Sequence, residues 1–208
     1  MKVLLFNGSP HPNGCTHAAL QTVATTLNQQ GIETEILSIG TGITHDCIAC
    51  GACKKSTPAC VFNDDCVNTW IAKAQTADAF VFGSPVYYAH PTGALLSAMD
   101  RLFYAGGQFL HHKPAAAVLT ARRAGTTASM DVINKYFTIN QMPIVASTYW
   151  NQAYRAKDGT PAADAEGLQT RQHLGNNMAW LLKCLDAGRA KGIEPPTQTK
   201  AVVTNFLA

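Results

Sequence analysis

The chain opens with an apolar stretch at residues 3–6 that runs into a loop of small and hydroxyl-bearing residues, 8–16, and then into a helical pattern over 17–30. Four consecutive apolar residues predict a strand that is buried on both faces. In the helical segment, apolar residues recur at the spacing of one helix face, at Leu20, Val23 and Leu27. A buried strand followed by a helix is the first unit of a parallel sheet, so this opening restricts the chain to a small set of α/β folds.

The same alternation continues along the chain. Strands are expected at residues 3–6, 32–39, 79–82, 115–119 and 144–146, and helices at 17–30, 67–75, 95–103, 130–137 and 174–185. Apolar strands separated by helices predict a doubly wound, five-stranded parallel sheet with helices on both faces and strand order 2-1-3-4-5. We therefore expect one α/β domain over residues 1–208, with a cysteine-bearing loop at 40–66 and a C-terminal arm from about residue 189.

The loop at residues 8–16 has the composition of a phosphate-binding loop. Backbone N–H groups and the positive end of the dipole meet at a helix N-terminus, and Ser9 and Thr16 add hydroxyl donors. The loop lacks both the Lys-Ser/Thr ending of a Walker A motif and the three spaced glycines of a dinucleotide-binding motif. It therefore indicates a monophosphate on a larger ligand, which points to FMN.

A second loop supports the same site. The segment Gly83-Ser84-Pro85-Val86-Tyr87-Tyr88 follows the third expected strand and places aromatic side chains there. In the order 2-1-3-4-5, the loops after strands 1 and 3 meet at one crevice. Two suitable loops at the same crevice favour a flavin site over two unrelated turns.

Charge and composition exclude several classes of partner. The net charge is +3, only 14% of residues are charged, and no cluster of Lys and Arg forms a nucleic-acid track. No segment approaches the ~20 apolar residues of a membrane span, and the N-terminal apolar run is too short for a signal peptide. We expect a cytoplasmic protein that binds neither nucleic acid nor membranes, so its seven cysteines are not a secretory disulfide framework.

Four of these cysteines form a compact motif. Cys47, Cys50 and Cys53 have the spacing that presents three thiolates to one iron–sulfur cluster, and Cys60 follows as the fourth ligand. The pattern predicts a [4Fe–4S] cluster and leaves two alternatives open. These are free thiols and a zinc ion, although four-cysteine zinc sites usually use two separated Cys-x2-Cys pairs. Cys66 is left over, and Cys184 is expected in the core.

Several blocks together resemble the NAD(P)H-dependent FMN reductase family, and within it the iron–sulfur flavoproteins. They are Gly8-Ser9-Pro10, the loop at 47–66 with Asp64-Asp65, the segment at 83–87, and Met99-Asp100-Arg101-Leu102. The resemblance covers roughly residues 3–150. It implies a flavodoxin-like fold, non-covalently bound FMN, NAD(P)H as co-substrate, and a homodimer or homotetramer with the flavin near a subunit interface.

The resemblance also assigns residues to the cofactor. It places Ser9, His11, Asn13, Cys15 and Thr16 around the FMN phosphate, Ser84, Pro85, Val86 and Tyr87 along the ribityl chain and ring, and Thr120, Ala121 and Gly125 at the other edge of the ring. There are two departures, because His11 stands where the family commonly has Arg, and Cys15 where it commonly has Asn. Histidine and cysteine are weaker donors than the residues they replace, so phosphate binding is expected to be weaker or pH-dependent.

The resulting expectation is an FMN-dependent oxidoreductase. Hydride would pass from NAD(P)H to FMN, and electrons then to a flavin, a quinone or another small acceptor. The cofactor performs this chemistry, so no side chain is expected to act as a catalytic acid or base. Asp100 and Arg101, adjacent on a helix, are expected to form an ion pair or a subunit contact. The alternatives are an FMN/iron–sulfur electron carrier between partner proteins and a non-enzymatic flavodoxin-like regulatory protein.

Overall fold

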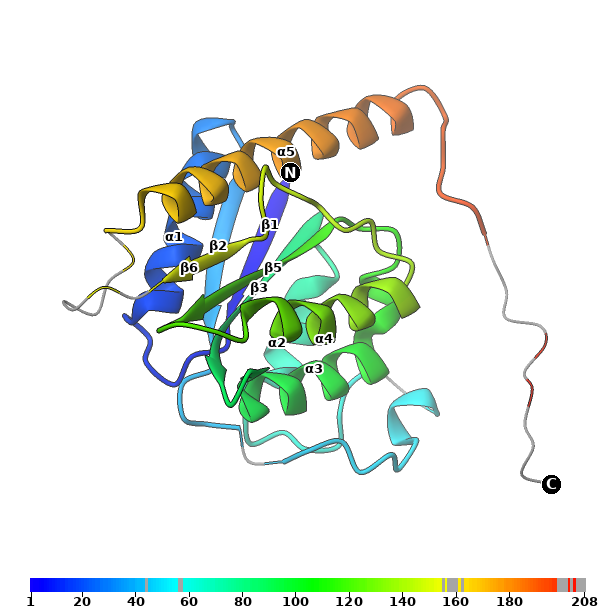
Figure 1. Ribbon diagram of the computed structural model, residues 1–208. Coiled ribbons are helices and arrows are strands. Elements are labelled where there is room, and N and C mark those ends of the chain that lie inside the picture. Colours follow the sequence, from blue (N-terminus) through cyan, green and yellow to red (C-terminus); the bar gives the residue numbers. More distant parts are fainter. Residues whose placement is uncertain are drawn as a thin grey trace.

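The computed structural model describes residues 1–43, 45–55, 58–154, 156, 161, 163–197, 202 and 204. It shows a parallel sheet between two layers of helices (Figure 1). In chain order the elements are β1 Lys2–Asn7, α1 Cys15–Gln29, β2 Glu33–Ser38, η1 Ala52–Lys54, α2 Val67–Ala74, β3 Ala79–Tyr87, β4 His90–Pro91, α3 Gly93–Gly106, η2 Gly107–Phe109, β5 Ala115–Ala121, α4 Thr126–Ile139, β6 Gln152–Tyr154 and α5 Ala165–Arg189.

The order of the strands confirms the predicted topology. The sheet runs β2-β1-β3-β5-β6 with every pair parallel, and this is the expected order 2-1-3-4-5. The short strand β4 is additional, and it pairs antiparallel with the end of β3. The fold is therefore the doubly wound α/β fold with its crevice between β1 and β3.

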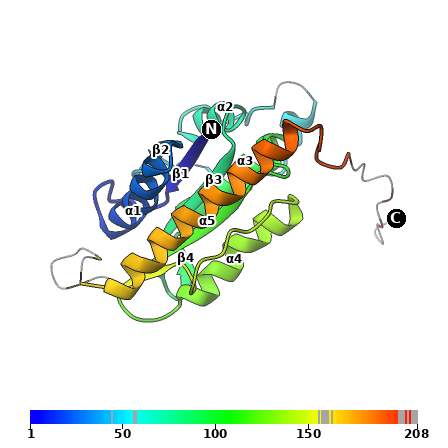
Figure 2. The same cartoon turned by 90° about the horizontal axis from the view of Figure 1, so that it is seen from above.

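Alternate residues of the central strands pack on opposite faces of the sheet. Leu4 and Phe6 of β1 lie in the core formed with α2, α3 and α4, whereas Val3 and Leu5 lie in the core formed with α1 and α5. Seen from above, α5 runs along the sheet (Figure 2). Because side chains of a strand alternate with period two, a strand covered on both faces must be apolar throughout, as residues 3–6 are.

The last strand lies elsewhere than the sequence predicts. Residues 144–146 were expected to form it, but the structure has only an isolated bridge between Ala115 and Ile144 there, and β6 lies at Gln152–Tyr154. Val145 is still buried, and its N–H donates to the Ala115 carbonyl at 2.8 Å. Val145 is the only buried residue of the apolar segment 144–146. Pairing with β5 then resumes at Gln152, a polar residue of a kind that is common in loops.

The described chain leaves the body of the fold after helix α5. Helix α5 ends at Arg189, and residues 191–197 beyond it are exposed and extend away from the sheet (Figure 1). None of the described helices combines the length and the apolar character that crossing a membrane requires.

The carboxyl ends of β1 and β3 approach each other closely. The N–H of Gly8 donates to the carbonyl oxygen of Gly83 at 2.8 Å. A Cβ atom at Gly8 would lie 2.8 Å from Cβ of Leu95 and 2.9 Å from the Gly83 carbonyl oxygen, which is closer than real side chains come. Glycine at this position therefore allows the loops after β1 and β3 to begin side by side.

We predict that Gly8→Ala destabilises the protein by about 1–3 kcal/mol, because the added methyl group must displace backbone or a packed leucine. The free energy of unfolding in urea measures this. Gly42→Ala is the matched control, since a Cβ there meets no atom within 4 Å, and it should change stability by less than about 0.5 kcal/mol. Equal effects of the two substitutions would contradict the close approach.

Candidate functional site

A cleft of about 500 Å³ opens at the carboxyl ends of β1, β3 and β5. This volume is within the usual range for small-molecule sites. The residues that line it are Ser9, His11, Gly14, Cys15, Thr16, Pro85, Val86, Tyr87, Thr120, Ala121 and Arg122. The tertiary structure thus brings the loop after β1, the end of β3 and the end of β5 to one place, as the strand order requires.

One end of the cleft has the features of an anion site. Helix α1 begins there with Gly14 as its N-cap, and no side chain caps it. The hydroxyl oxygen of Ser9 accepts a hydrogen bond from the His11 N–H at 3.1 Å, which leaves the Ser9 O–H to donate to a ligand. Thr16 and Thr120 are joined through their hydroxyl groups at 2.8 Å, so the start of α1 is tied to the end of β5.

Three of the residues that the resemblance assigned to the cofactor do not line the cleft. Asn13 is exposed on the loop outside it. Ser84 is fully buried, where it donates to the Pro85 carbonyl at 2.8 Å and accepts from the Thr92 N–H at 3.0 Å. Ser84 therefore links the end of β3 to the N-terminus of α3. Gly14 and Arg122 line the cleft but were not predicted, because neither stands out in the sequence.

The third of these residues, Gly125, supports the cleft from behind. It has a left-handed backbone (φ 94°), and a Cβ atom there would lie 2.5 Å from Cα of Ala89. Ala89 belongs to the turn of the β3–β4 hairpin, so Gly125 allows the start of α4 to pack directly against that turn. The position favours glycine for both its conformation and its lack of a side chain.

The hairpin turn itself is strained and carries exposed tyrosines. Tyr88 and Ala89 both have positive φ, 51° and 58°, which for residues with a Cβ costs about 1–2 kcal/mol each. Tyr88 is fully exposed, and Tyr87, which lines the cleft, is about half exposed. The turn lacks the Asn-Gly pair that usually marks such a hairpin, so the sequence did not predict it.

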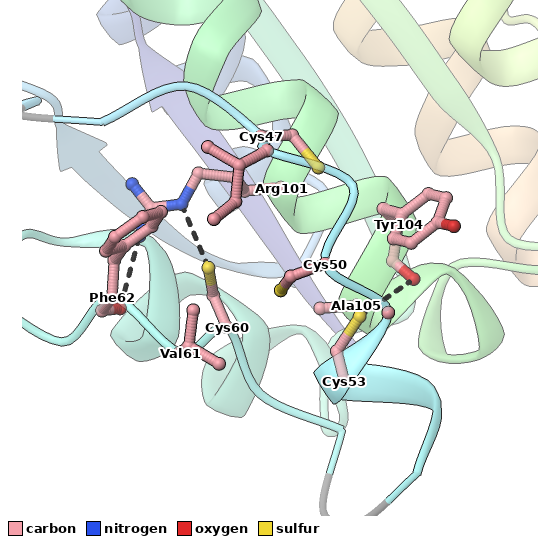
Figure 3. A pocket seen from close by; sticks show the side chains of 11 residues that line it. Cys47, Cys50, Cys53, Cys60, Val61, Phe62, Arg101, Tyr104 and Ala105 are labelled. Carbon is pink, nitrogen blue, oxygen red and sulfur yellow. Dashed lines mark hydrogen bonds between the residues drawn. The ribbon is translucent and has the colours of Figure 1, made fainter.

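A second pocket gathers the four predicted metal ligands. Cys47, Cys50, Cys53 and Cys60, all free thiols, line it together (Figure 3). The rest of the lining is Ile48, Gly51, Val61, Phe62, Arg101, Tyr104 and Ala105. Burial raises the pKa of the Cys53 thiol, and the neighbouring thiols of the other three raise it further. The loop therefore brings the four sulfur atoms into one neighbourhood.

The four thiols surround a space rather than a single point. Within the described part of the chain, no three His, Cys, Asp or Glu side chains are arranged to hold one metal ion. A tetrahedral zinc site needs four ligand atoms at about 2.0–2.3 Å from the same ion. The arrangement therefore differs from a compact zinc site, although the donor set remains one of four thiols.

Arg101 of α3 connects the cysteine loop to the fold. Its side chain is fully buried and forms a buried ion pair with Asp65, including an Nη2–Oδ1 contact of 3.1 Å. It also donates from Nε to Sγ of Cys60 at 3.2 Å and from Nη2 to the Phe62 carbonyl at 3.2 Å (Figure 3). Burial acts to lower the pKa of Arg101, but the hydrogen bonds with Asp65 and Cys60 outweigh it and raise the pKa.

This geometry corrects the expectation for Asp100 and Arg101. The partner of Arg101 is Asp65, from the end of the cysteine loop, and Asp100 instead accepts a hydrogen bond from the hydroxyl of Tyr136. Adjacent helical residues point in different directions, so they do not pair with each other. Asp65 and Arg101 both belong to segments that the sequence analysis singled out, but no sequence pattern predicted the ion pair between these two residues, which lie 36 positions apart.

The remaining two cysteines of interest lie outside the pocket. Cys66 is partly buried next to α2, and burial raises its pKa to about 11. Cys184 is exposed on α5, so the expectation that it is a core residue is wrong. Asn68 of α2 provides a further anchor for the loop, because its amide oxygen accepts from the Cys60 N–H at 2.8 Å and its amide nitrogen donates to the Cys60 carbonyl at 3.0 Å.

We predict that Arg101→Met destabilises the protein by about 3–5 kcal/mol, because it leaves the carboxylate of Asp65 buried without a counter-charge. Unfolding in urea measures the loss. The double variant Arg101→Met/Asp65→Leu removes both charges and should recover much of the stability. A double variant that is less stable than Arg101→Met would show that the ion pair is not the source of the effect.

Comparison with known proteins agrees with this geometry. Residues 1–156 match the family described as NADPH-dependent FMN reductase. Two iron–sulfur flavoproteins of Methanocaldococcus jannaschii are 30% and 28% identical to this chain, over 89% and 88% of its length and 99% and 98% of their own.

Solved structures show the same fold at low identity. A flavone reductase superposes with a TM-score of 0.67 at 15% identity, over 89% of this chain and 64% of its own. A flavodoxin from the domain Archaea superposes with a TM-score of 0.59 at 15% identity, over 88% of this chain and 99% of its own. The match over residues 1–156, together with full-length relatives, shows that the chain belongs to the NADPH-dependent FMN reductase family.

Proposed function

We propose that this protein is an FMN-dependent oxidoreductase that takes a hydride from NADH or NADPH and passes the electrons to a flavin, a quinone or another small acceptor. The observation that carries the proposal is the cleft at the carboxyl edge of the sheet. It combines the uncapped N-terminus of α1 with Tyr87 from the exposed aromatic hairpin. Family membership supplies the reaction class.

The phosphate end of FMN would bind at the start of α1. The first-turn N–H groups and the helix dipole favour an anion there, and the hydroxyl groups of Ser9 and Thr16 are donors at the same end. Gly14 leaves the N-cap open because it has no side chain to compete for these donors. The residues present therefore fit a phosphate group.

The ring end of FMN would bind between the end of β3 and the loop after β5. Pro85 and Val86 add apolar surface, and Thr120 and Ala121 line the cleft beside them, because Thr120 pairs with Pro85 in the β3–β5 ladder. Tyr87, about half exposed at the rim, is placed to stack with a nicotinamide or an acceptor. When bound, FMN supplies hydride acceptance and electron release, and the protein's tasks are to hold the ring and leave one face open.

The cysteine pocket would hold a [4Fe–4S] cluster. Four thiols around a common space, with a mostly apolar lining, are the donor set and surroundings that such clusters use. Both relatives from Methanocaldococcus jannaschii are named iron–sulfur flavoproteins, which supports the same assignment. The N–H of Arg101 that donates to Cys60 would also act on a bound cluster, because hydrogen bonds to ligand sulfur atoms influence the reduction potential.

The proposed activity can be tested by anaerobic reduction of the flavin-loaded protein. FMN bound to the purified protein should lose its visible absorbance on addition of NADPH or NADH, since both electrons of the nicotinamide hydride move to the flavin. The control is the same mixture without the nicotinamide. If bound FMN stays oxidised with either nucleotide but is reduced by dithionite, the protein is an electron carrier; if no FMN binds, the non-enzymatic alternative holds.

We predict that Cys→Ser substitution at 47, 50, 53 or 60 lowers the iron content of protein purified anaerobically, because each removes one thiolate ligand. Iron and acid-labile sulfide assays measure this alongside the visible spectrum. Cys66→Ser and Cys184→Ser are the matched controls, since neither residue lines the pocket, and both should retain the wild-type iron content. A wild-type protein without iron after cluster reconstitution would contradict the cluster assignment.

A further inference from the structure

Arg171 is a buried cation with two guanidinium nitrogen atoms that lack a hydrogen-bond partner in the described part of the chain. It lies on α5 with only 1% of its surface exposed. Among the described residues, none provides a hydrogen-bond partner for its Nε or Nη1 atoms. A buried guanidinium normally binds a carboxylate or carbonyl groups, since removing it from water without such partners is costly.

Arg101 is a second buried arginine, and its contacts are those of a structural residue. The two side chains are equally buried, at 1% exposed. Arg101 forms an ion pair and donates to Cys60, Phe62 and His45, whereas Arg171 has no hydrogen bond and no ion pair with any described residue. Arg171 is therefore buried without the contacts that would account for a purely structural role.

The acidic group near Arg171 is already engaged. Asp164 caps α5, where its carboxylate accepts from the Gly167 N–H at 2.9 Å and the Tyr154 N–H at 2.8 Å. No ion pair within 4 Å joins Asp164 to Arg171 in the described structure. Asp164 offsets part of the positive charge at a distance, but the donors of the guanidinium remain unpaired.

Arg171 lies on the helix that packs along α1, with its Nη1 atom 2.9 Å from the position that a Cβ atom of Gly167 would occupy. One turn further along α5, Gly175 packs directly against α1, where its Cβ position lies 2.7 Å from Cβ of Thr26, and α5 runs beside α1 (Figure 1). Helical side chains tilt toward the N-terminus, so Arg171 reaches back along α1 toward its first turn. Burial lowers the pKa of Arg171, and the negative charges of Asp164 and Cys15 oppose that shift. Cys15 itself lines the cleft.

The loop at residues 8–16 lacks a permanent cation. Between Ser9 and Thr16 the only basic side chain is that of His11, which is exposed, and the loop contains no lysine or arginine. Arg122 lines the cleft, but it is exposed to solvent at the end of β5. A phosphate monoester carries about two negative charges near neutral pH. The loop alone therefore leaves most of that charge without a fixed counter-charge.

We propose that Arg171 is a positioning residue for the phosphate of the bound flavin, and that it supplies from α5 the positive charge that the loop itself lacks. The inference rests on the proposed function, because it concerns the same cleft. The phosphate would compensate a buried cation whose Nε and Nη1 atoms have no hydrogen-bond partner among the described residues. The protein would then select flavins that carry a phosphate over those that do not.

The test is a comparison of FMN with riboflavin, which shares the ring and ribityl chain but lacks the phosphate. Binding to the apoprotein is followed by quenching of flavin fluorescence. Arg171→Met should weaken FMN binding about 10- to 100-fold, as expected for the loss of a charged partner, and change riboflavin binding less than about threefold. Arg171→Lys, which keeps the charge, should retain most of the preference for FMN.

Two controls separate this role from a structural one. Arg189→Met removes a cation from the exposed end of the same helix and should leave the FMN-to-riboflavin affinity ratio unchanged. The thermal midpoint of the apoprotein should not fall in Arg171→Met, because the substitution removes an uncompensated buried charge. Should Arg171→Met fail to fold, Arg171→Gln, which is neutral and polar, provides the same affinity ratio.

Each other outcome has a distinct meaning. Equal loss of FMN and riboflavin affinity would show that Arg171 supports the cleft structurally, and the proposal would be wrong. An unchanged ratio in a folded Arg171→Met or Arg171→Gln protein would also overturn it. If the wild-type protein binds neither flavin, the proposed function fails, and that result is distinguishable because it does not depend on any substitution at Arg171.

Discussion

The parallel pairing of β1 with both β2 and β3 is the constraint on which the rest of the structure depends. Because the chain winds outward from β1 in both directions, α1 and α5 cover one face of the sheet and α2, α3 and α4 cover the other, and the loops after β1 and β3 diverge to leave a crevice. The contact between Gly8 and Gly83 keeps the two loops adjacent at their start. This arrangement positions the N-terminus of α1, the aromatic hairpin and the start of α4.

Two buried arginines connect this framework to the two candidate sites in different ways. Arg101 joins α3 to the cysteine loop. Its Nε, Nη1 and Nη2 atoms all donate hydrogen bonds to that loop, including the bond from Nε to Cys60. Arg171 lies on α5 with Nε and Nη1 unpaired in the described structure. The contacts of Arg101 account for its burial, whereas those of Arg171 do not, and this contrast is the basis for the proposed role of Arg171.

Much of the site could be predicted because it follows from strand order. Once β1 and β3 were recognised as apolar strands, the loops that follow them had to share one edge, which placed Ser9, Thr16 and Tyr87 in one cleft. The sequence did not show the burial of Ser84, because a serine beside a proline looks the same whether its hydroxyl faces a ligand or caps the backbone. It also did not place β6, since a polar edge strand of three residues has no apolar pattern.

The sequence by itself determined the fold class, the strand order, the two loops of the crevice and the four cysteines of the second pocket. These features depend on local periodicity and on spacing between neighbouring residues, and both can be read along the chain. The tertiary structure alone decided which distant side chains meet. The partners Asp65 and Arg101 are 36 positions apart, and Arg171 comes beside α1 only because α5 packs along it. Such contacts depend on how the helices pack on the sheet, and local sequence patterns contain no information about this packing.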